Sequence, residues 1–218
     1  DRVWTFTPAL DISETYDSST RTARGFGKDY ITRVTPVIAG AVDANRLKGK
    51  FSYAPALSYY AMNANQNGVA HNLNSDLTGT LIEDLLYANL RGFASTQPIL
   101  GGLNTGGGGR LEEAQSTNFT GGLFMQKRFG DLATVAANWS VTRSTLESMA
   151  PRNTPTLVPG LNQNYTSQSE AASIPSGPDF DRISTALSAN ATQYYGTGLY
   201  KGAHNETVTL AAGYAFTR

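Results

Sequence analysis

The sequence contains no cysteine and only two histidines, His71 and His204, among its 218 residues. A chain without cysteine forms no disulfide bond, and it has no thiolate to act as a nucleophile or to bind a metal ion. Two histidines far apart in the sequence, with no serine or acidic partner at a recognisable spacing, are a poor basis for a zinc site or for catalysis. We therefore expect no metal, no cofactor and no enzymatic activity.

Charged residues are scarce as well, since they make up 16% of the chain against about 25% in an average protein. The 17 basic and 17 acidic residues cancel to a formal net charge of zero. Surfaces that bind nucleic acid are strongly basic, so this balance gives no reason to expect a nucleic-acid partner.

Long apolar runs are missing too, and none approaches the ~18 residues that a transmembrane helix needs. The run VIAGAV at 37–42 is among the longest and is far too short. A helical membrane protein is thereby excluded. A membrane β-barrel stays open, because each of its strands needs only about 10 residues of weak alternation.

What the chain has instead is alternation of residue type, which is the pattern of a β-strand. In LKGKFSYAPALSY, at 47–59, the large residues Leu47, Phe51 and Leu57 share one parity, and Lys48 and Lys50 share the other. Similar stretches predict about nine strands, at 4–16, 30–44, 47–59, 71–82, 86–94, 118–128, 133–143, 181–192 and 207–216. No helical period is sustained anywhere.

The connections alternate in length. Short turns are expected at 44–45, 83–84 and 129–131, and long loops at about 17–29, 63–70, 95–115 and 147–179. Short turns on one side and long loops on the other are typical of outer-membrane barrels, whereas a β-sandwich has no reason to sort its loops in this way. We predict one all-β domain over 1–218, an antiparallel transmembrane outer-membrane β-barrel, with a soluble sandwich or barrel as the lesser alternative.

In such a barrel the apolar face contacts lipid and the polar face lines a wet lumen, whereas in a sandwich the apolar face is the core. The twelve residue steps from Trp4 to Tyr16, at ~3.3 Å each and a ~40° tilt, span roughly 30 Å, which suits a bilayer. The predicted lumen-lining residues are Asp11, Arg33, Asp43, Lys48, Lys50, Asp76, Arg91, Arg128 and Arg182. The predicted aromatic girdle consists of Trp4, Phe6, Tyr16, Phe51, Tyr53, Tyr59, Trp139, Tyr214 and Phe216.

Three prolines interrupt this pattern, because Pro8, Pro36 and Pro55 fall in the middle of predicted strands and share the outward parity. Proline has no N–H to donate to a neighbouring strand and is normally confined to sheet edges or bulges. We predict local bulges at these positions.

The N-terminal segments also carry a resemblance. WTFTPALDISETYDSSTR, DYITRVTPVIAGAV and RLKGKFSYAPALSYYAMNANQNGVAHNLN resemble the β-barrel porin type 2 family, over roughly residues 1–95. These are outer-membrane proteins of Gram-negative bacteria, associated with exopolysaccharide and protein-sorting gene clusters. The resemblance implies an outer-membrane location, contact with membrane lipid, and a role in diffusion or export of saccharides or other small polar solutes. It implies no catalytic residue.

Two questions stay open at this point. Nine strands is an odd number, and single-chain bacterial barrels have even numbers; either a strand is hidden within 156–173 or the chain is part of a larger barrel, and we favour the second. The other question concerns function. A structural or adhesive surface barrel without an open pore, with a surface-complex partner or a second copy of the chain, is the alternative to a porin-like channel.

Overall fold

The computed structural model describes residues 3–22, 25–98, 113–149, 163–177, 183–197 and 202–214. Its strands belong to one antiparallel sheet, so the prediction of an all-β antiparallel protein is confirmed. The elements are β1 (Trp4–Thr22), β2 (Gly25–Asp43), β3 (Leu47–Tyr53), β4 (Ala56–Tyr60), the 3-10 helix η1 (Ala64–Gln66), β5 (Gly68–Ala70), β6 (Leu73–Ile82), β7 (Leu86–Pro98), β8 (Glu113–Phe129), β9 (Ala133–Ser148), β10 (Gln163–Pro175), β11 (Ile183–Thr197) and β12 (His204–Tyr214).

No helix in the described ranges is long and apolar enough to cross a membrane.

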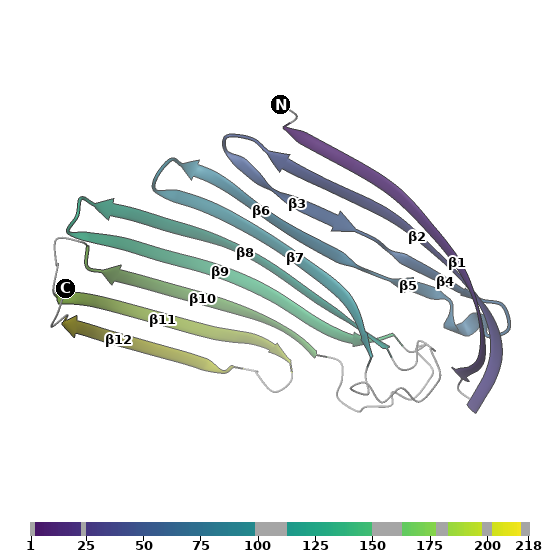
Figure 1. Ribbon diagram of the computed structural model, residues 1–218. Coiled ribbons are helices and arrows are strands. Elements are labelled where there is room, and N and C mark those ends of the chain that lie inside the picture. The colour runs from purple at the N-terminus through teal and green to yellow at the C-terminus, as the bar shows by residue number, and fades with distance from the viewer. Residues whose placement is uncertain are drawn as a thin grey trace.

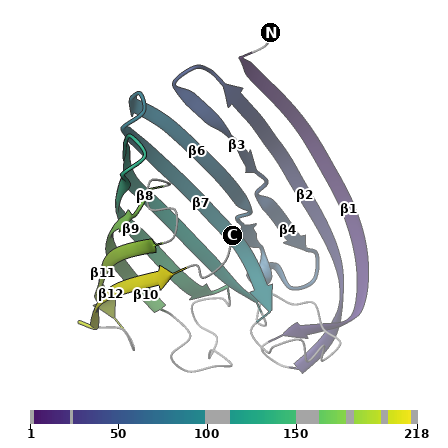
Figure 2. The ribbon, with the colours of Figure 1, turned by 60° about the vertical axis from the view of Figure 1, so that its left-hand side comes forward.

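Apart from β3–β4 and β5–β6, strands that follow one another along the chain lie side by side in the sheet (Figure 1). β3 and β4 lie end to end along β2, and β5 and β6 lie end to end beside them, so twelve strands make ten paths across the sheet. The sheet is open: within the described residues β1 pairs only with β2, and β12 only with β11. The second view shows these two edges on opposite sides of the curved sheet (Figure 2).

Several strands run further than the alternation predicts. β10 occupies part of the expected loop at 147–179 and pairs with both β9 and β11, so a strand was indeed missed there. β1 and β2 also extend well into the expected loop at 17–29, and β7 and β8 into that at 95–115. The rest of those two loops lies outside the described residues.

The predicted bulges at Pro8 and Pro36 are wrong, because the β1–β2 register runs unbroken through both residues. The backbone N–H of Asp43 donates to Val3, so residues of odd number form the hydrogen-bonded pairs of β1 with β2. Pro8 falls between them, and the position of its missing N–H faces the open edge of the sheet. An edge is where a strand tolerates proline.

Pro36 and Pro55, in contrast to Pro8, interrupt the pairing between strands. The pairs Ile38–Tyr53 and Val34–Leu57 place these two prolines opposite each other, and neither can donate a hydrogen bond. The pairing with β2 lapses at this point, and it is here that β3 ends and β4 begins. The predicted single strand at 47–59 is therefore two strands, which keep one parity across the break.

The register defines two faces of the sheet. On one, which we call the apolar face, Phe6 and Phe51 both lie beside Gly40. The other, the polar face, carries the remaining parity, with Lys50 beside Asp76. In the described part of the chain only five hydrophobic residues are buried: Ile31, Val42, Tyr60, Ala94 and Ala114. The sheet thus forms a single layer without a core of its own, and Trp4 is 65% exposed and Leu210 75%.

The strands are also staggered. One row of paired residues crosses the sheet from β2 to β8 through Gly40, Phe51, Ser75, Gly92 and Phe119. On β2 the row lies three residues before the end of the strand at Asp43, and on β8 it lies ten residues before the end at Phe129. This shift of seven residues over four strand steps, at ~3.3 Å per residue and ~4.8 Å between strands, corresponds to a tilt of roughly 45–50°. The strands are therefore steeply tilted relative to the line that joins the short turns.

Candidate functional site

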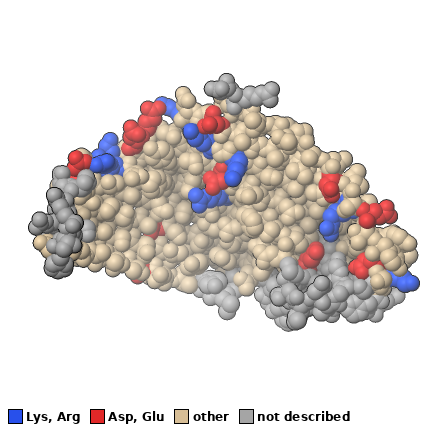
Figure 3. Space-filling model, in the orientation of Figure 1, with Lys and Arg blue, Asp and Glu red and all other residues tan. Residues whose placement is uncertain are grey.

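The polar face of β2, β3, β6 and β7 carries a chain of alternating charges. The Lys48 ammonium lies 3.2 Å from the Asp43 carboxylate, and the Arg91 guanidinium lies 3.3 Å from that of Asp76. Lys50 pairs with Asp76 in the register, so this carboxylate lies between two cations. Basic and acidic side chains lie together in the middle of this face (Figure 3). Since all are largely exposed, the pairs leave the charges accessible to a polar solute.

Three other predicted lumen residues, Asp11, Arg33 and Arg128, share this face but are more scattered. Asp11 lies on β1 opposite Thr35, and the Arg33 guanidinium donates to the Ser58 hydroxyl at 3.4 Å. Arg128 lies beside the β8–β9 turn, where it donates to the Gly130 carbonyl at 2.8 Å and pairs with Asp131. Arg182 lies outside the described residues. The structure thus brings together five of the nine predicted residues, and that they line a pore stays a prediction.

From β9 to β12 the described polar face carries no charged side chain and is lined by hydroxyl and amide groups. Two hydroxyl pairs link neighbouring strands here, Thr120 with Thr142 at 2.9 Å and Ser169 with Thr192 at 3.2 Å. Neutral hydroxyl pairs across strands stabilise a sheet modestly and leave further lone pairs for a ligand. The polar face therefore has a charged part, β2 to β7, and a neutral part, β9 to β12.

A hollow of about 460 Å³ lies where these two parts meet. Its lining combines the cation of Arg91, the ring pair of Tyr87 and Phe124 with centroids 6.2 Å apart, and the amide of Asn138. The side-chain oxygen of Asn89 is buried there without a hydrogen-bond partner. Small-molecule sites combine such apolar surface with a few polar groups that orient the ligand. This hollow is a candidate ligand site on the polar face.

The aromatic residues predicted as a girdle lie on the apolar face wherever they are described. Trp4, Phe6, Tyr16, Phe51, Tyr59, Trp139 and Tyr214 are exposed there. Tyr53 is only half-buried on the same face, and its hydroxyl contacts Nδ1 of His71 at 2.8 Å. Phe216 lies outside the described residues.

A cluster of polar and charged side chains at one end of the apolar face was not predicted. Glu206 pairs with His204 at 3.1 Å, Glu170 accepts a hydrogen bond from Gln168 at 2.8 Å, and Arg143 donates to Thr166 at 3.0 Å. These residues lie on β9, β10 and β12. The alternation did not find Gln168 and Glu170 because β10 has polar residues on both parities, so its strand pattern is weak.

Comparison of the sequence with known protein families gives no match, and neither does comparison with curated proteins. Conclusions about function therefore depend on the residues and their arrangement.

Proposed function

We propose that this chain forms the wall of an outer-membrane β-barrel channel. Its apolar face contacts lipid, and its polar face lines a water-filled passage for small polar solutes, saccharides among them. The residues that line the passage are those of the charged part and of the neutral part together.

The observation that carries this proposal is the distribution of charge on the apolar face. On β1 the apolar face is uncharged from Trp4 to Ile12 and Glu14 follows; on β9 it is uncharged from Ala133 to Val141 and Arg143 follows. Among the strand residues whose side chains the structure describes, the charged residues of this face are Glu14, Lys28, Glu113, Lys127, Arg143, Glu147, Glu170 and Glu206. All but Lys127 lie toward the end of the sheet where β1 meets β2 and β11 meets β12, and Lys127 lies beside the opposite end.

The uncharged stretch forms a band across the sheet. Eight residue steps at ~3.3 Å each and a ~45° tilt give the band a height of roughly 20 Å, close to the ~25 Å apolar band of outer-membrane barrels. The tilt itself is also near the ~45° of membrane-spanning strands. A surface in water has no reason to exclude charge from a band of this height, and lipid does.

The described residues form no second layer on this sheet, which supports the same conclusion. In a soluble sandwich the apolar face would pack on another sheet and become the core. Here large side chains of that face are exposed from β1 to β12, and Phe6, Leu10 and Ile12 are each more than half exposed. Lipid is the environment that satisfies an apolar face of this size.

Electrical recording from the folded protein in a planar lipid bilayer tests the proposal. Discrete, stable conductance steps are the expected result, together with different gel mobilities of the unheated and the boiled protein in detergent. Equal mobilities and no insertion would contradict the membrane barrel. Insertion with no conductance would contradict the channel and favour a structural or adhesive barrel.

A further inference from the structure

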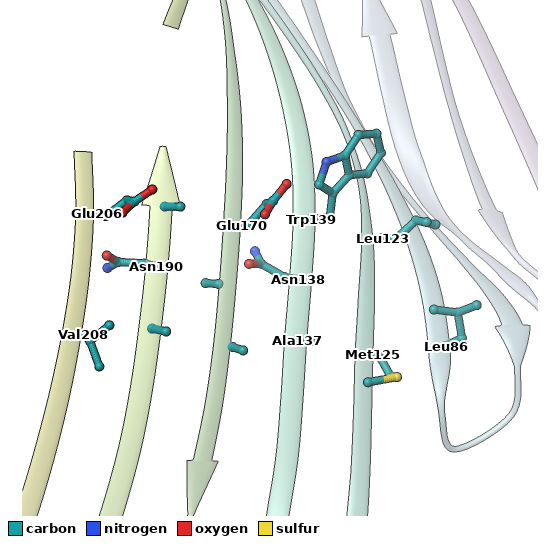
Figure 4. A pocket seen from close by; sticks show the side chains of 14 residues that line it. Leu86, Leu123, Met125, Ala137, Asn138, Trp139, Glu170, Asn190, Glu206 and Val208 are labelled. Carbon is teal, nitrogen blue, oxygen red and sulfur yellow. The ribbon is translucent and has the colours of Figure 1, made fainter. Parts of the chain in front are cut away.

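The apolar face contains a second hollow, of about 590 Å³, between β7 and β12. Its floor is made of the short side chains of Ala172 and Ala189, and the larger Trp139 and Val208 stand beside it. Figure 4 shows Trp139, Glu170 and Glu206 side by side at one end of this hollow. A hollow of this volume is in the range of sites that bind small ligands.

The register explains why these side chains lie together. Trp139 pairs with Glu170, Glu170 with Ala191, and Ala191 with Glu206, so one row of the sheet carries an indole and two carboxylates. Glu170 and Glu206 are separated by a single alanine. The end of the apolar hollow is therefore acidic.

No lysine or arginine in the described part of the chain forms an ion pair with either carboxylate. Glu170 is bonded to the neutral amide of Gln168, and Glu206 to His204. A carboxylate at the border of a hydrocarbon layer loses hydration, and a cation beside it offsets that loss. Two carboxylates at the end of an apolar hollow thus fit a ligand with a long chain and a cationic head.

We propose that this hollow binds a long-chain amphiphile with a protonated amine headgroup. The chain lies over the alanine floor, and the ammonium group lies between Glu170 and Glu206, where it donates hydrogen bonds to both carboxylates. This inference rests on the proposed function, because it takes the apolar face as the one that contacts lipid.

Fluorescence of Trp139 provides a direct test. The chain has two tryptophans, and the variant Trp4→Phe leaves Trp139 as the sole indole. The probes are three 18-carbon amphiphiles, brominated at mid-chain so that contact quenches the indole, with an amine, an alcohol or a carboxylate head. They are titrated in detergent micelles at neutral pH. The amine is expected to reach half-maximal quenching at a mole fraction at least tenfold lower than the carboxylate, with the alcohol in between.

Variants separate recognition of the head from packing of the chain. Glu170→Gln with Glu206→Gln should bring the amine within about twofold of the alcohol. The matched control Glu147→Gln, on the same face but outside the hollow, should leave the preference unchanged. Ala189→Phe fills the floor and should weaken quenching by all three probes. Equal quenching by the three heads, or a preference that survives the double glutamine variant, would overturn the proposal.

The bilayer experiment tells the two proposals apart. A protein that inserts and conducts but shows no amine preference keeps the channel and loses the amphiphile site. A protein that prefers the amine in detergent but never inserts keeps the site and loses the channel. Shielding of Trp139 from all three probes, with a dimer in sedimentation, would assign the hollow to a second copy of the chain and overturn the site.

Discussion

The two halves of the sheet place their charges on opposite faces. From β3 to β7 the described charges of the strands lie on the polar face, as in the Lys50, Asp76 and Arg91 group, and the apolar face has none. From β9 to β12 the arrangement is reversed, with a neutral polar face and with Glu170 and Glu206 on the apolar face. Alternation of polarity therefore defines two faces in both halves, but it does not predict which face carries the charged side chains.

In a channel this difference would make the field one-sided. Charges act over about 8–10 Å at physiological ionic strength, so a solute would feel the charged part of the wall and only hydrogen-bond donors and acceptors on the neutral part. A wall of this kind orients dipolar solutes more than it excludes ions.

The largest effect is expected when arginine is placed in the middle of the apolar face. Leu10→Arg on β1 and Leu210→Arg on β12 should each lower the free energy of unfolding from lipid vesicles by ~2–4 kcal/mol, because a charge at the membrane midplane is costly. Both halves should respond alike, since the two leucines lie within the same uncharged band. Guanidinium titration of the vesicle-bound protein measures the change.

Arginine at the neighbouring positions on the polar face provides the control. Ala9→Arg and Thr209→Arg put the same charge one residue away, facing water, and should change the unfolding free energy by less than ~0.5 kcal/mol. Larger losses from these two variants than from the leucine variants would mean that the faces are inverted.

Ion selectivity distinguishes the charged part from the neutral part. Changing Lys48, Lys50 and Arg91 together to glutamate converts three positive charges to negative, and the reversal potential in a salt gradient should change sign toward cations. Glutamate at Ser140, Thr192 and Thr207 adds three negative charges to the neutral part, and should shift the potential in the same direction by about half as much. Because the second set changes the charge by half as much, equal shifts would show that ions pass closer to the neutral part than to the charged part.

The prolines offer a smaller effect with a matched control. Pro55→Val supplies an N–H opposite the carbonyl of Pro36, so β3 and β4 should join into one strand with a gain of about 1 kcal/mol. Pro8→Val supplies an N–H that faces the open edge of the described sheet and should bring no such gain. Hydrogen exchange measures both, and slow exchange is expected at residue 55 only. Protection at residue 8 instead would indicate that another strand covers that edge.

The smallest effects concern single cross-strand pairs. A double-mutant cycle on Asp76 and Arg91 should give a coupling of ~0–1 kcal/mol that disappears in 1 M salt, because both side chains are exposed. A cycle with valine at Thr120 and Thr142 should give ~0.2–1 kcal/mol that salt does not change. Salt-dependent coupling in the threonine pair would contradict the assignment of β9 as neutral wall.

Much of the fold could be predicted from local pattern, and the failures have identifiable causes. β9 was found because Trp139 and Val141 alternate with Asn138 and Ser140, but β10 was missed because Thr166, Gln168 and Glu170 make both of its parities polar. Such a strand is stabilised by pairing with its neighbours, and its own residue pattern does not predict it. The break at Pro55 was not foreseen either, because it depends on a second proline, Pro36, lying opposite on another strand, so that neither residue donates a hydrogen bond there.

The candidate sites show the same limit. The charges of Asp43, Lys48 and Lys50 were found because they lie on one hairpin, where the turn brings them together. The row of Trp139, Glu170 and Glu206 was not found, because its members come from three strands with long connections between them.

The sequence by itself determined which residues share a face, because side chains alternate along any extended strand and a chain this rich in alternation has no other regular structure to adopt. Only the tertiary structure decided which residues on that face are neighbours. Register between distant strands depends on pairing along their whole length and on the stagger of the sheet, and no local pattern encodes either. The charged part and the neutral part of the polar face, and the acidic end of the apolar hollow, are therefore products of the assembled sheet.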